Sequence, residues 1–474
     1  MGVAIHIKNI KGHDYAYDVK TTWDKEQKKY RKQTKYLGVV IDRQMKTYER
    51  RYGPKIQEEK LILDYGDTYL LAQTAKRSDL QGIFDSVLPK ERSTLWSLLF
   101  FKILTDLAFM YAESWYRGNY ASILYKDANL TSQRVSEFLK RLGNERVLRG
   151  FFEKYLNAVA DKECGVIIDS TGLPNEINIP VSQFGHHGGE TERETRLIMV
   201  VDQKTRTPLY FRYVAGNIVD VSTLQGTVSE LYKMGVKSTF VLLDAGYYSE
   251  DNIKNLYVSK IDFLTRLPAG RLLYKQLVAD TAEDLEKSQN LVIYNGRSLF
   301  IKRAEVDLFG NKGFAYVVCD LKRKLSESNK FLIAAREDNL PNDEIDTGLK
   351  FKGKFVLISD KELEAAEVIP LYYTRQSAER LFGVSKSILD TLPIRAHLEA
   401  VMRGVLLLNF MALVLFTELQ KALGVFSTVE EALLEARNLK CKVFDDSIIV
   451  AEPNRRFKDI LANSGITVPN MSGI

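Results

Sequence analysis

The chain has 474 residues, of which 45% are hydrophobic and 27% are charged, and its formal net charge is +6. This composition is typical of a globular protein that is too long for one hydrophobic core, so we expect about two to four domains. Three scattered cysteines without a C-x-x-C pair exclude a disulfide framework and a structural zinc site, and they fit a reducing compartment.

Membrane insertion is not expected from the sequence. The longest apolar run, Gly404 to Phe416, is interrupted by Asn409 and is shorter than the ~18 residues of a membrane span. It therefore predicts a buried core helix. Because no secretory signal is visible, we expect a cytoplasmic protein.

The first region, residues 1–78, is basic and rich in tyrosine. Between Lys20 and Lys55 there are 12 Lys or Arg residues against 4 acids, so the positive charge of the chain is concentrated here. Two interpretations stay open, a solvated hairpin face and a surface that contacts DNA phosphates. The candidate DNA-binding residues of this region are Lys28, Lys29, Arg31, Lys32 and Lys35.

Residues 79–160 show apolar residues at helical intervals and predict a helical region. The segment from Ser132 to Leu142 begins with a capping signal and slightly resembles a helix-turn-helix. A generic helical bundle is the simpler interpretation, and a DNA-contacting bundle is the alternative.

The pattern from residue 161 to 268 is that of an α/β domain. Three strands are followed by helix, strand, helix and strand, which is the order of a ribonuclease-H-like core. The predicted strands are Gly165–Ser170, Arg196–Gln203, Leu209–Ala215, Thr239–Asp244 and Ile261–Arg266, and the predicted helices are Val221–Met234 and Ser249–Ser259.

Residues 269–355 predict a β-rich insertion, after which residues 356–422 return to the catalytic domain as long helices. The predicted strands are Leu291–Tyr294, Ser298–Arg303, Phe314–Cys319 and Phe331–Ala335. Pro393 separates two predicted helices, Tyr372–Leu392 and Arg395–Ala422, because proline cannot continue a helix. The C-terminal region, residues 423–474, is uninformative.

Two apolar runs each end in an aspartate, Ile-Ile-Asp169 and Leu-Leu-Asp244. Runs of this kind predict strands buried on both faces, and carboxylates placed where such strands end can share a divalent cation. The adjacent histidines His186 and His187 are weak metal candidates, since they cannot easily face one ion from a strand.

A third acid is predicted on a helix at Tyr372-x2-Arg375-x3-Glu379-x6-Lys386. Tyr372, Glu379 and Lys386 are spaced by two turns and fall on one stripe of a regular helix. An exposed face with i, i+4 ion pairs is the simpler interpretation of such a stripe. Rival third carboxylates, which read as a solvated surface, are Glu362, Glu364 and Glu367.

With both aspartates, this spacing resembles the DDE transposases of bacterial insertion sequences, in the branch marked by a Y-R-E-K signature. Asp169 resembles the first acid of the family, and Asp244 the second. Further similarity lies in Gly216-Asn217-x-x-Asp220 and in Arg395-x-His397. The resemblance covers roughly residues 160–415.

The resemblance implies an α/β fold with a ribonuclease-H-like mixed sheet flanked by helices and a β-rich insertion between Asp244 and Glu379. It implies that Asp169, Asp244 and Glu379 hold two Mg²⁺ ions, for which Mn²⁺ can substitute. Water would cut the element end, and the freed 3′-OH would attack target DNA. Arg375 and Lys386 would hold phosphates, and Tyr372 would stack on a base or bond a phosphate.

The partners implied by the resemblance are the terminal inverted repeats and the target DNA, with a homodimer that joins two ends and no membrane. The resemblance also implies a protein of the bacterial cytoplasm that is associated with the nucleoid. Two alternatives remain from the residues alone, a ribonuclease-H-like nuclease or resolvase without strand transfer and a catalytically inert DNA-binding relic. A metal phosphomonoesterase would not need the basic region.

Overall fold

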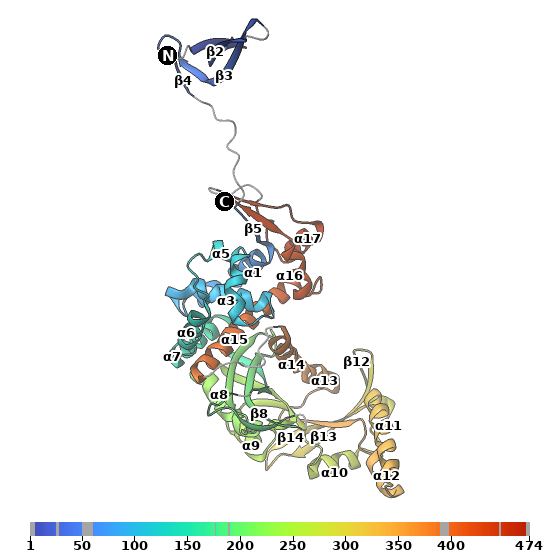
Figure 1. Ribbon diagram of the computed structural model, residues 1–474. Coiled ribbons are helices and arrows are strands. Elements are labelled where there is room, and N and C mark those ends of the chain that lie inside the picture. The colour runs from blue at the N-terminus through green and yellow to red at the C-terminus, as the bar shows by residue number, and fades with distance from the viewer. Residues whose placement is uncertain are drawn as a thin grey trace. The chain divides into compact units, whose positions relative to one another are not determined.

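The computed structural model describes residues 5–24, 28–49, 60–175, 177–187, 190–388, 398–444 and 447–470. The chain forms two compact units, drawn in Figure 1. Unit 1 comprises Met1–Leu61 and Val443–Ser447, and unit 2 comprises Ile62–Lys442 and Ile448–Ile474. The predicted boundary at Pro393, together with Arg395 and His397, lies outside the described residues.

Unit 1 contains a four-stranded antiparallel sheet in the order β1–β2–β3–β4. Its strands are β1 (Ile5–Ile10), β2 (His13–Asp24), β3 (Lys29–Asp42) and β4 (Thr47–Glu49). A bulge interrupts the pairing of β2 with β3 at Ala16 and Tyr17. The basic region therefore forms strands, as the hairpin interpretation predicts.

The core of unit 2 is a ten-stranded sheet, and five of its strands have the ribonuclease-H order β9–β8–β6–β10–β11. The first three strands are antiparallel neighbours, whereas β10 runs parallel to both β6 and β11. These strands are β6 (Glu163–Pro174), β8 (Glu190–Asp202), β9 (Pro208–Ala215), β10 (Lys237–Leu243) and β11 (Asp262–Leu267), with β7 (Gln183–His187) at the edge. The helix α8 (Leu224–Lys233) lies between β9 and β10 in the chain, and α9 (Glu250–Val258) connects β10 to β11.

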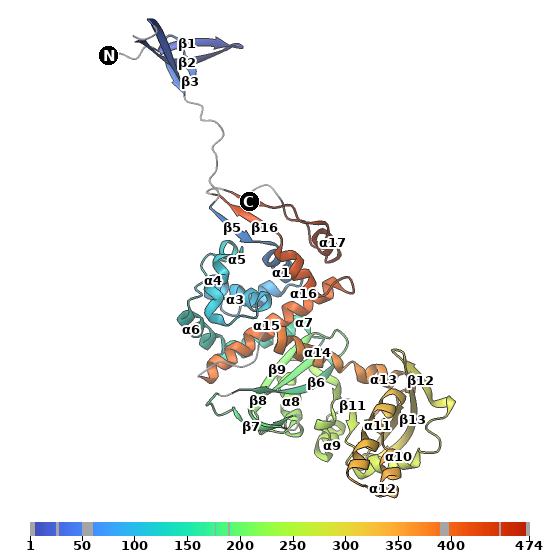
Figure 2. The same cartoon turned by 45° about the vertical axis from the view of Figure 1, so that its right-hand side comes forward.

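The insertion extends this same sheet beyond β11, as Figure 2 shows in yellow and orange. Its strands are β15 (Lys354–Ser359), β14 (Lys312–Asp320), β13 (Arg297–Asp307) and β12 (Leu291–Tyr294), all antiparallel to their neighbours. It also contains three helices, α10 (Leu272–Asp280), α11 (Leu321–Glu337) and α12 (Asn342–Leu349).

The predicted strand at Phe331–Ala335 is wrong, because these residues belong to α11. Asp320 caps this helix by accepting a hydrogen bond from the Arg323 backbone N–H at 3.1 Å. The short apolar run is part of this capped helix of 17 residues. Such runs do not distinguish a strand from part of a helix.

A long helix, α15 (Glu399–Leu423), runs between the helical region and the sheet. Among the described residues it is the unbent helix with the length and composition of a membrane span, but 78% of its apolar window is buried within the protein. The predicted core helix is thus confirmed. The surrounding helices are α1 (Gly66–Arg77), α2 (Leu80–Asp85), α3 (Arg92–Leu104), α4 (Ala112–Arg117), α5 (Ala121–Leu124), α6 (Ser132–Leu142) and α7 (Glu145–Val159).

The backbones of α6 and α15 approach closely through two glycines. A Cβ on Gly404 would lie 1.9 Å from the Leu139 carbonyl oxygen, and one on Gly143 would lie 1.8 Å from the Ala400 carbonyl oxygen. The buried face of α6 therefore packs against α15, which favours the bundle interpretation of this region over a free DNA-reading helix.

The C-terminal part adds α16 (Val429–Arg437), α17 (Arg455–Asn463) and a small three-stranded sheet. This sheet has the order β17 (Ile448–Val450), β16 (Lys440–Val443) and β5 (Leu61–Asp64). Residues near the start of the helical region are thereby joined to the end of the chain.

Candidate active site

Asp169 lies at the place where the parallel pairing of β6 with β10 ends. The last paired residues are Ile168 and Leu243, and Asp169 and Asp244 follow them directly. The strand predicted at Gly165–Ser170 is too short at its end, since β6 continues to Pro174 by pairing with β8. The two aspartates are nevertheless neighbours at one edge of the parallel pair, as the apolar runs predict.

Asp244 ends β10 and precedes a short 3-10 turn, Ala245–Tyr247. The Thr265 hydroxyl of β11 donates a hydrogen bond to the Asp244 carbonyl at 3.2 Å, which ties this turn to the next strand. The Asp244 side chain is 40% exposed, so it faces the open side of the site.

The helix predicted from Tyr372 is divided into α13 (Ala365–Tyr373), α14 (Gln376–Gly383) and a π-helical turn at Val384–Ile388. At the junction the backbone N–H groups of Thr374 and Arg375 donate to carbonyls three residues earlier. This tightening to i→i−3 bonds changes the rotation of the chain. Tyr372 and Glu379 therefore do not share the stripe of one regular helix, and that expectation is wrong.

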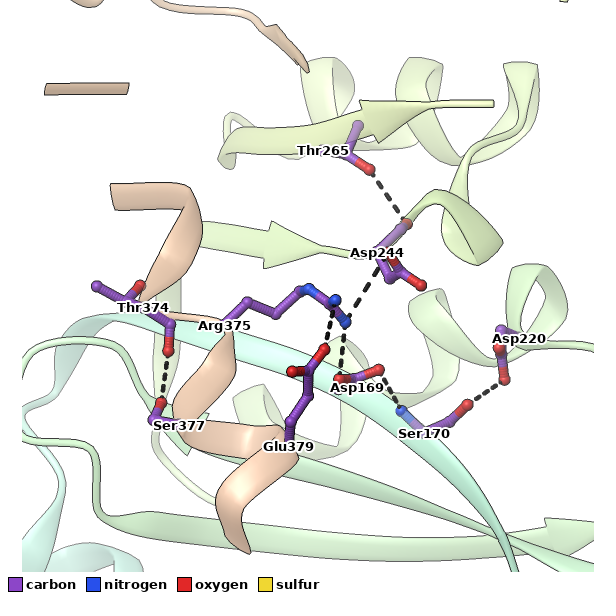
Figure 3. Close-up of polar contacts among 9 residues, drawn as sticks. All are labelled: Asp169, Ser170, Asp220, Asp244, Thr265, Thr374, Arg375, Ser377 and Glu379. Carbon is purple, nitrogen blue, oxygen red and sulfur yellow. Dashed lines mark hydrogen bonds and ion pairs between the residues drawn. The ribbon is translucent and has the colours of Figure 1, made fainter. Parts of the chain in front are cut away.

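The guanidinium of Arg375 lies among the three predicted acids, as Figure 3 shows. Its Nη1 is 3.0 Å from Asp169 Oδ2 and 3.8 Å from Asp244 Oδ1. Its Nη2 is 2.6 Å from Glu379 Oε1. Three carboxylates from β6, the end of β10 and α14 thus converge on one positive charge.

Asp169 is the most buried of the three acids, with a side chain that is 11% exposed. The pKa of its carboxyl is raised from 3.8 to about 7, chiefly by burial. The Arg375 charge and the Ser170 N–H act to lower this pKa, whereas the Asp244 and Glu379 charges act to raise it. The Ser170 backbone N–H donates to Asp169 Oδ1 at 2.9 Å. The carboxyl is therefore fixed in orientation but unfavourably charged.

Tyr372 packs near Arg375, and Lys386 contacts the strand that carries Asp169. Tyr372 is 7% exposed, its ring centroid is 5.9 Å from the Arg375 guanidinium carbon, and burial raises the pKa of its hydroxyl to about 12. Lys386 Nζ donates to the Thr171 hydroxyl at 2.6 Å, on the same strand face as Asp169, and burial lowers the pKa of its ammonium. The structure thus places Arg375 and Glu379 in the acid cluster, Tyr372 against Arg375, and Lys386 against Thr171 two positions after Asp169.

A second group of charged residues contacts β6 through Ser170, the residue after Asp169. The Ser170 hydroxyl donates to Asp220 Oδ1 at 2.5 Å, and Arg196 Nη1 lies 3.0 Å from the same oxygen. Arg196 Nη2 also lies 3.2 Å from Glu194, whose side chain is 3% exposed. The sequence does not predict this contact of Asp220 with the strand that carries Asp169. The signal for its position was the Gly216-Asn217-x-x-Asp220 spacing, whereas Arg196 and Glu194 gave none.

The other candidate site residues either lie away from the acid cluster or have side chains outside the described residues. The rival acids Glu362, Glu364 and Glu367 are exposed, in agreement with a solvated surface, and Glu362 pairs with Arg303. The side chains of His186 and His187 are outside the described residues. The five basic candidates, Lys28, Lys29, Arg31, Lys32 and Lys35, all belong to unit 1 and are exposed.

The donor chemistry of the cluster fits a hard divalent cation. One guanidinium against three carboxylates leaves two negative charges when all three acids are ionised. Carboxylate oxygens are the ligands that Mg²⁺ and Mn²⁺ take in proteins. In the described part of the chain, no group of three His, Cys, Asp or Glu side chains already encloses an ion position, because each acid of this cluster turns toward Arg375.

The part of the chain that contains the ten-stranded sheet matches a known protein family. Residues 160–415, more than half of the chain, match the family described as transposase DDE domain. The chain belongs to this family and is a DNA transposase, an enzyme of the nuclease and transferase class that acts on DNA. Enzymes of this family generally use a divalent metal ion.

A solved structure of a piggyBac transposase synaptic complex with hairpin DNA is similar over 79% of this chain and 70% of its own, with 11% identity and a TM-score of 0.40. No curated protein matches the chain.

Proposed function

We propose that Asp169, Asp244 and Glu379 hold Mg²⁺, and that the enzyme cuts the ends of its insertion sequence and joins them to target DNA. The observation that carries this proposal is the convergence of the three carboxylates on Arg375. When bound, divalent ions activate a water or a 3′-OH as nucleophile and stabilise the leaving oxygen at phosphorus. Mn²⁺ is expected to substitute, since it takes the same oxygen ligands.

The residues of the chain then have distinct tasks. Arg375 leaves the carboxylates and pairs with a phosphate near the cut bond, because a guanidinium binds carboxylate and phosphate by the same two-donor geometry. Lys386 holds a second phosphate from the Thr171 side. Because Tyr372 is buried, we assign it to packing beneath Arg375 and not to stacking on a base.

Two further parts of the proposal follow from the reaction. Joining two element ends in concert requires two active sites, so we propose a homodimer in the DNA complex. An enzyme of bacterial insertion sequences works where the chromosome lies, so we propose a cytoplasmic, nucleoid-associated protein. We also propose membership in the Y-R-E-K branch, on the four residues Tyr372, Arg375, Glu379 and Lys386.

The test is cleavage and joining with DNA that carries the terminal repeats of the element. Asp169→Ala, Asp244→Ala and Glu379→Ala are each expected to abolish Mg²⁺-dependent cleavage while DNA affinity remains. Glu367→Ala is the matched control, since it removes an exposed acid from the neighbouring helix α13. Normal cleavage by any of the three variants would show that its residue is misassigned.

Strand transfer is tested separately with ends that already carry a free 3′-OH and a target plasmid. Joined products are expected with the wild type and none with Glu379→Ala. Cleavage without joining would identify the nuclease alternative, and binding without cleavage would identify the inert relic.

A further inference from the structure

The β2–β3 hairpin of unit 1 projects beyond the rest of its sheet as a two-stranded ribbon. β1 pairs with β2 only at His13–Asp18, and β4 pairs with β3 only between Val39 and Asp42. In the described part of unit 1, residues 19–24 and 29–34 therefore pair only with each other. Figure 2 draws β2 and β3 as long strands of the blue sheet.

The two faces of this ribbon differ in chemistry. Strand alternation and the register place the aromatic pair Trp23 and Tyr30 on one face, directly opposite each other with ring centroids 4.8 Å apart. An isolated two-stranded hairpin is only marginally stable in water, and cross-strand aromatic pairs of this kind stabilise it. The aromatic face therefore explains how an exposed ribbon holds its shape.

The opposite face carries Lys29, Arg31, Gln33 and Lys35 along β3, with Lys20 and Thr22 opposite on β2. All six side chains are exposed. The register places two acids of β2 at positions of this face, Asp18 opposite Lys35 at the base of the ribbon and Asp24 opposite Lys29, against the four Lys and Arg residues. This face, defined by these residues, is called the basic face below, and its charge is complementary to that of nucleic acid.

The dimensions and residue types of the basic face suit duplex DNA. A two-stranded ribbon fits the major groove. Residues two apart on a strand are about 7 Å apart, close to two base-pair steps of about 3.4 Å each. In the major groove arginine donates two hydrogen bonds to guanine, and glutamine donates one to adenine and accepts one from it. Arg31 and Gln33 lie side by side on this face.

We infer that the ribbon enters the major groove of duplex DNA with its basic face toward the base edges and selects the DNA sequence that the enzyme cuts. This inference rests on the proposed function, because it names the element by which the enzyme recognises its own ends. The bulge at the base of the ribbon changes the direction of the strands there, as bulges next to functional surfaces commonly do.

The experiment uses the full-length protein and a duplex that it selects from a random-sequence library, with affinity measured by fluorescence anisotropy. Lys29→Gln/Arg31→Gln removes two charges from the basic face. Its matched control, Lys8→Gln/Lys32→Gln, removes two charges from the aromatic side, where Lys8 lies 5.3 Å from the Tyr17 ring centroid.

The expected result is that Lys29→Gln/Arg31→Gln weakens binding to the selected duplex by at least about tenfold. The ratio of its affinities for the selected and the random duplex should therefore be smaller than that of the wild type. The control variant should weaken both duplexes slightly and equally. Replacing purines of the selected duplex by 7-deazapurines, which lack the major-groove N7 acceptor, should weaken the wild type more than the Lys29→Gln/Arg31→Gln variant. Circular dichroism of both variants checks that the sheet is intact.

Three results would overturn the inference. The first is a library selection that enriches no sequence. The second is an equal loss of affinity for the selected duplex in both double variants, and the third is a larger loss in Lys8→Gln/Lys32→Gln than in Lys29→Gln/Arg31→Gln. Asp169→Ala protein should bind the selected duplex like the wild type. A failure of the proposed catalysis, seen as absent cleavage, is therefore distinguishable from a failure of the ribbon inference, seen as unchanged sequence preference.

Discussion

The buried carboxyl of Asp169 makes a prediction about stability that is independent of DNA. Because its folded-state pKa is raised from 3.8 to about 7, the folded protein holds a proton that the unfolded chain has already released between these values. The free energy of unfolding therefore falls as the pH rises from about 4 to about 7. Above about pH 7 the Asp169 carboxylate is ionised in the folded protein, and its burial lowers the free energy of unfolding by the full amount.

Asp169→Asn removes the charge and keeps the shape of the side chain. At about 1.4 kcal/mol for each pKa unit, the rise to about 7 corresponds to about 4 kcal/mol at pH above 7. We therefore expect the variant to be more stable than the wild type by about 4 kcal/mol near pH 8 and by about 2 kcal/mol near pH 5, with little difference below about pH 4.

Urea unfolding at several pH values, in the absence of divalent ions, measures this difference. Glu367→Gln is the control, since it neutralises an exposed acid and is expected to change stability by less than about 0.5 kcal/mol at every pH. The reasoning is refuted if Asp169→Asn is no more stable than the wild type near pH 8, or if its advantage does not shrink as the pH falls.

Two other predictions concern the cluster and the helix crossing. Arg375→Ala removes the cation that competes for the three acids, so Mn²⁺ affinity measured by electron paramagnetic resonance is expected to rise by about tenfold; unchanged or weaker binding contradicts the competition. Gly404→Ala places a methyl group against the Leu139 carbonyl and is expected to lower the free energy of unfolding by about 3 kcal/mol, whereas Gly150→Ala, with open space around it on α7, is expected to raise it by about 1 kcal/mol. Thermal and urea unfolding measure both changes in the free energy of unfolding. Equal changes for Gly404→Ala and Gly150→Ala would contradict the close approach of α6 and α15.

The sequence predicts the catalytic core well because its strands are buried on both faces. Continuous apolar runs ending at Asp169 and Asp244 leave few alternatives to adjacent parallel strands, and β6 and β10 pair as expected. The acid Glu379 was predicted from its spacing, and it lies at the cluster.

Tertiary structure decides the features that the sequence did not show. The division between α13 and α14 depends on backbone bonds at Thr374 and Arg375, for which no residue gives a stop signal. The contact of Asp220 with Ser170 joins residues 50 positions apart, so local patterns do not predict it. The run at Phe331–Ala335 is compatible with strand and helix alike, and the cap at Asp320 decides between them.

The measurement that tests the central claim most directly is anomalous diffraction from crystals of the enzyme soaked in Mn²⁺. The account predicts manganese density bounded by Asp169, Asp244 and Glu379, with the Arg375 guanidinium moved away from the three carboxylates. Manganese bound elsewhere, with Arg375 still paired to all three acids, would contradict it.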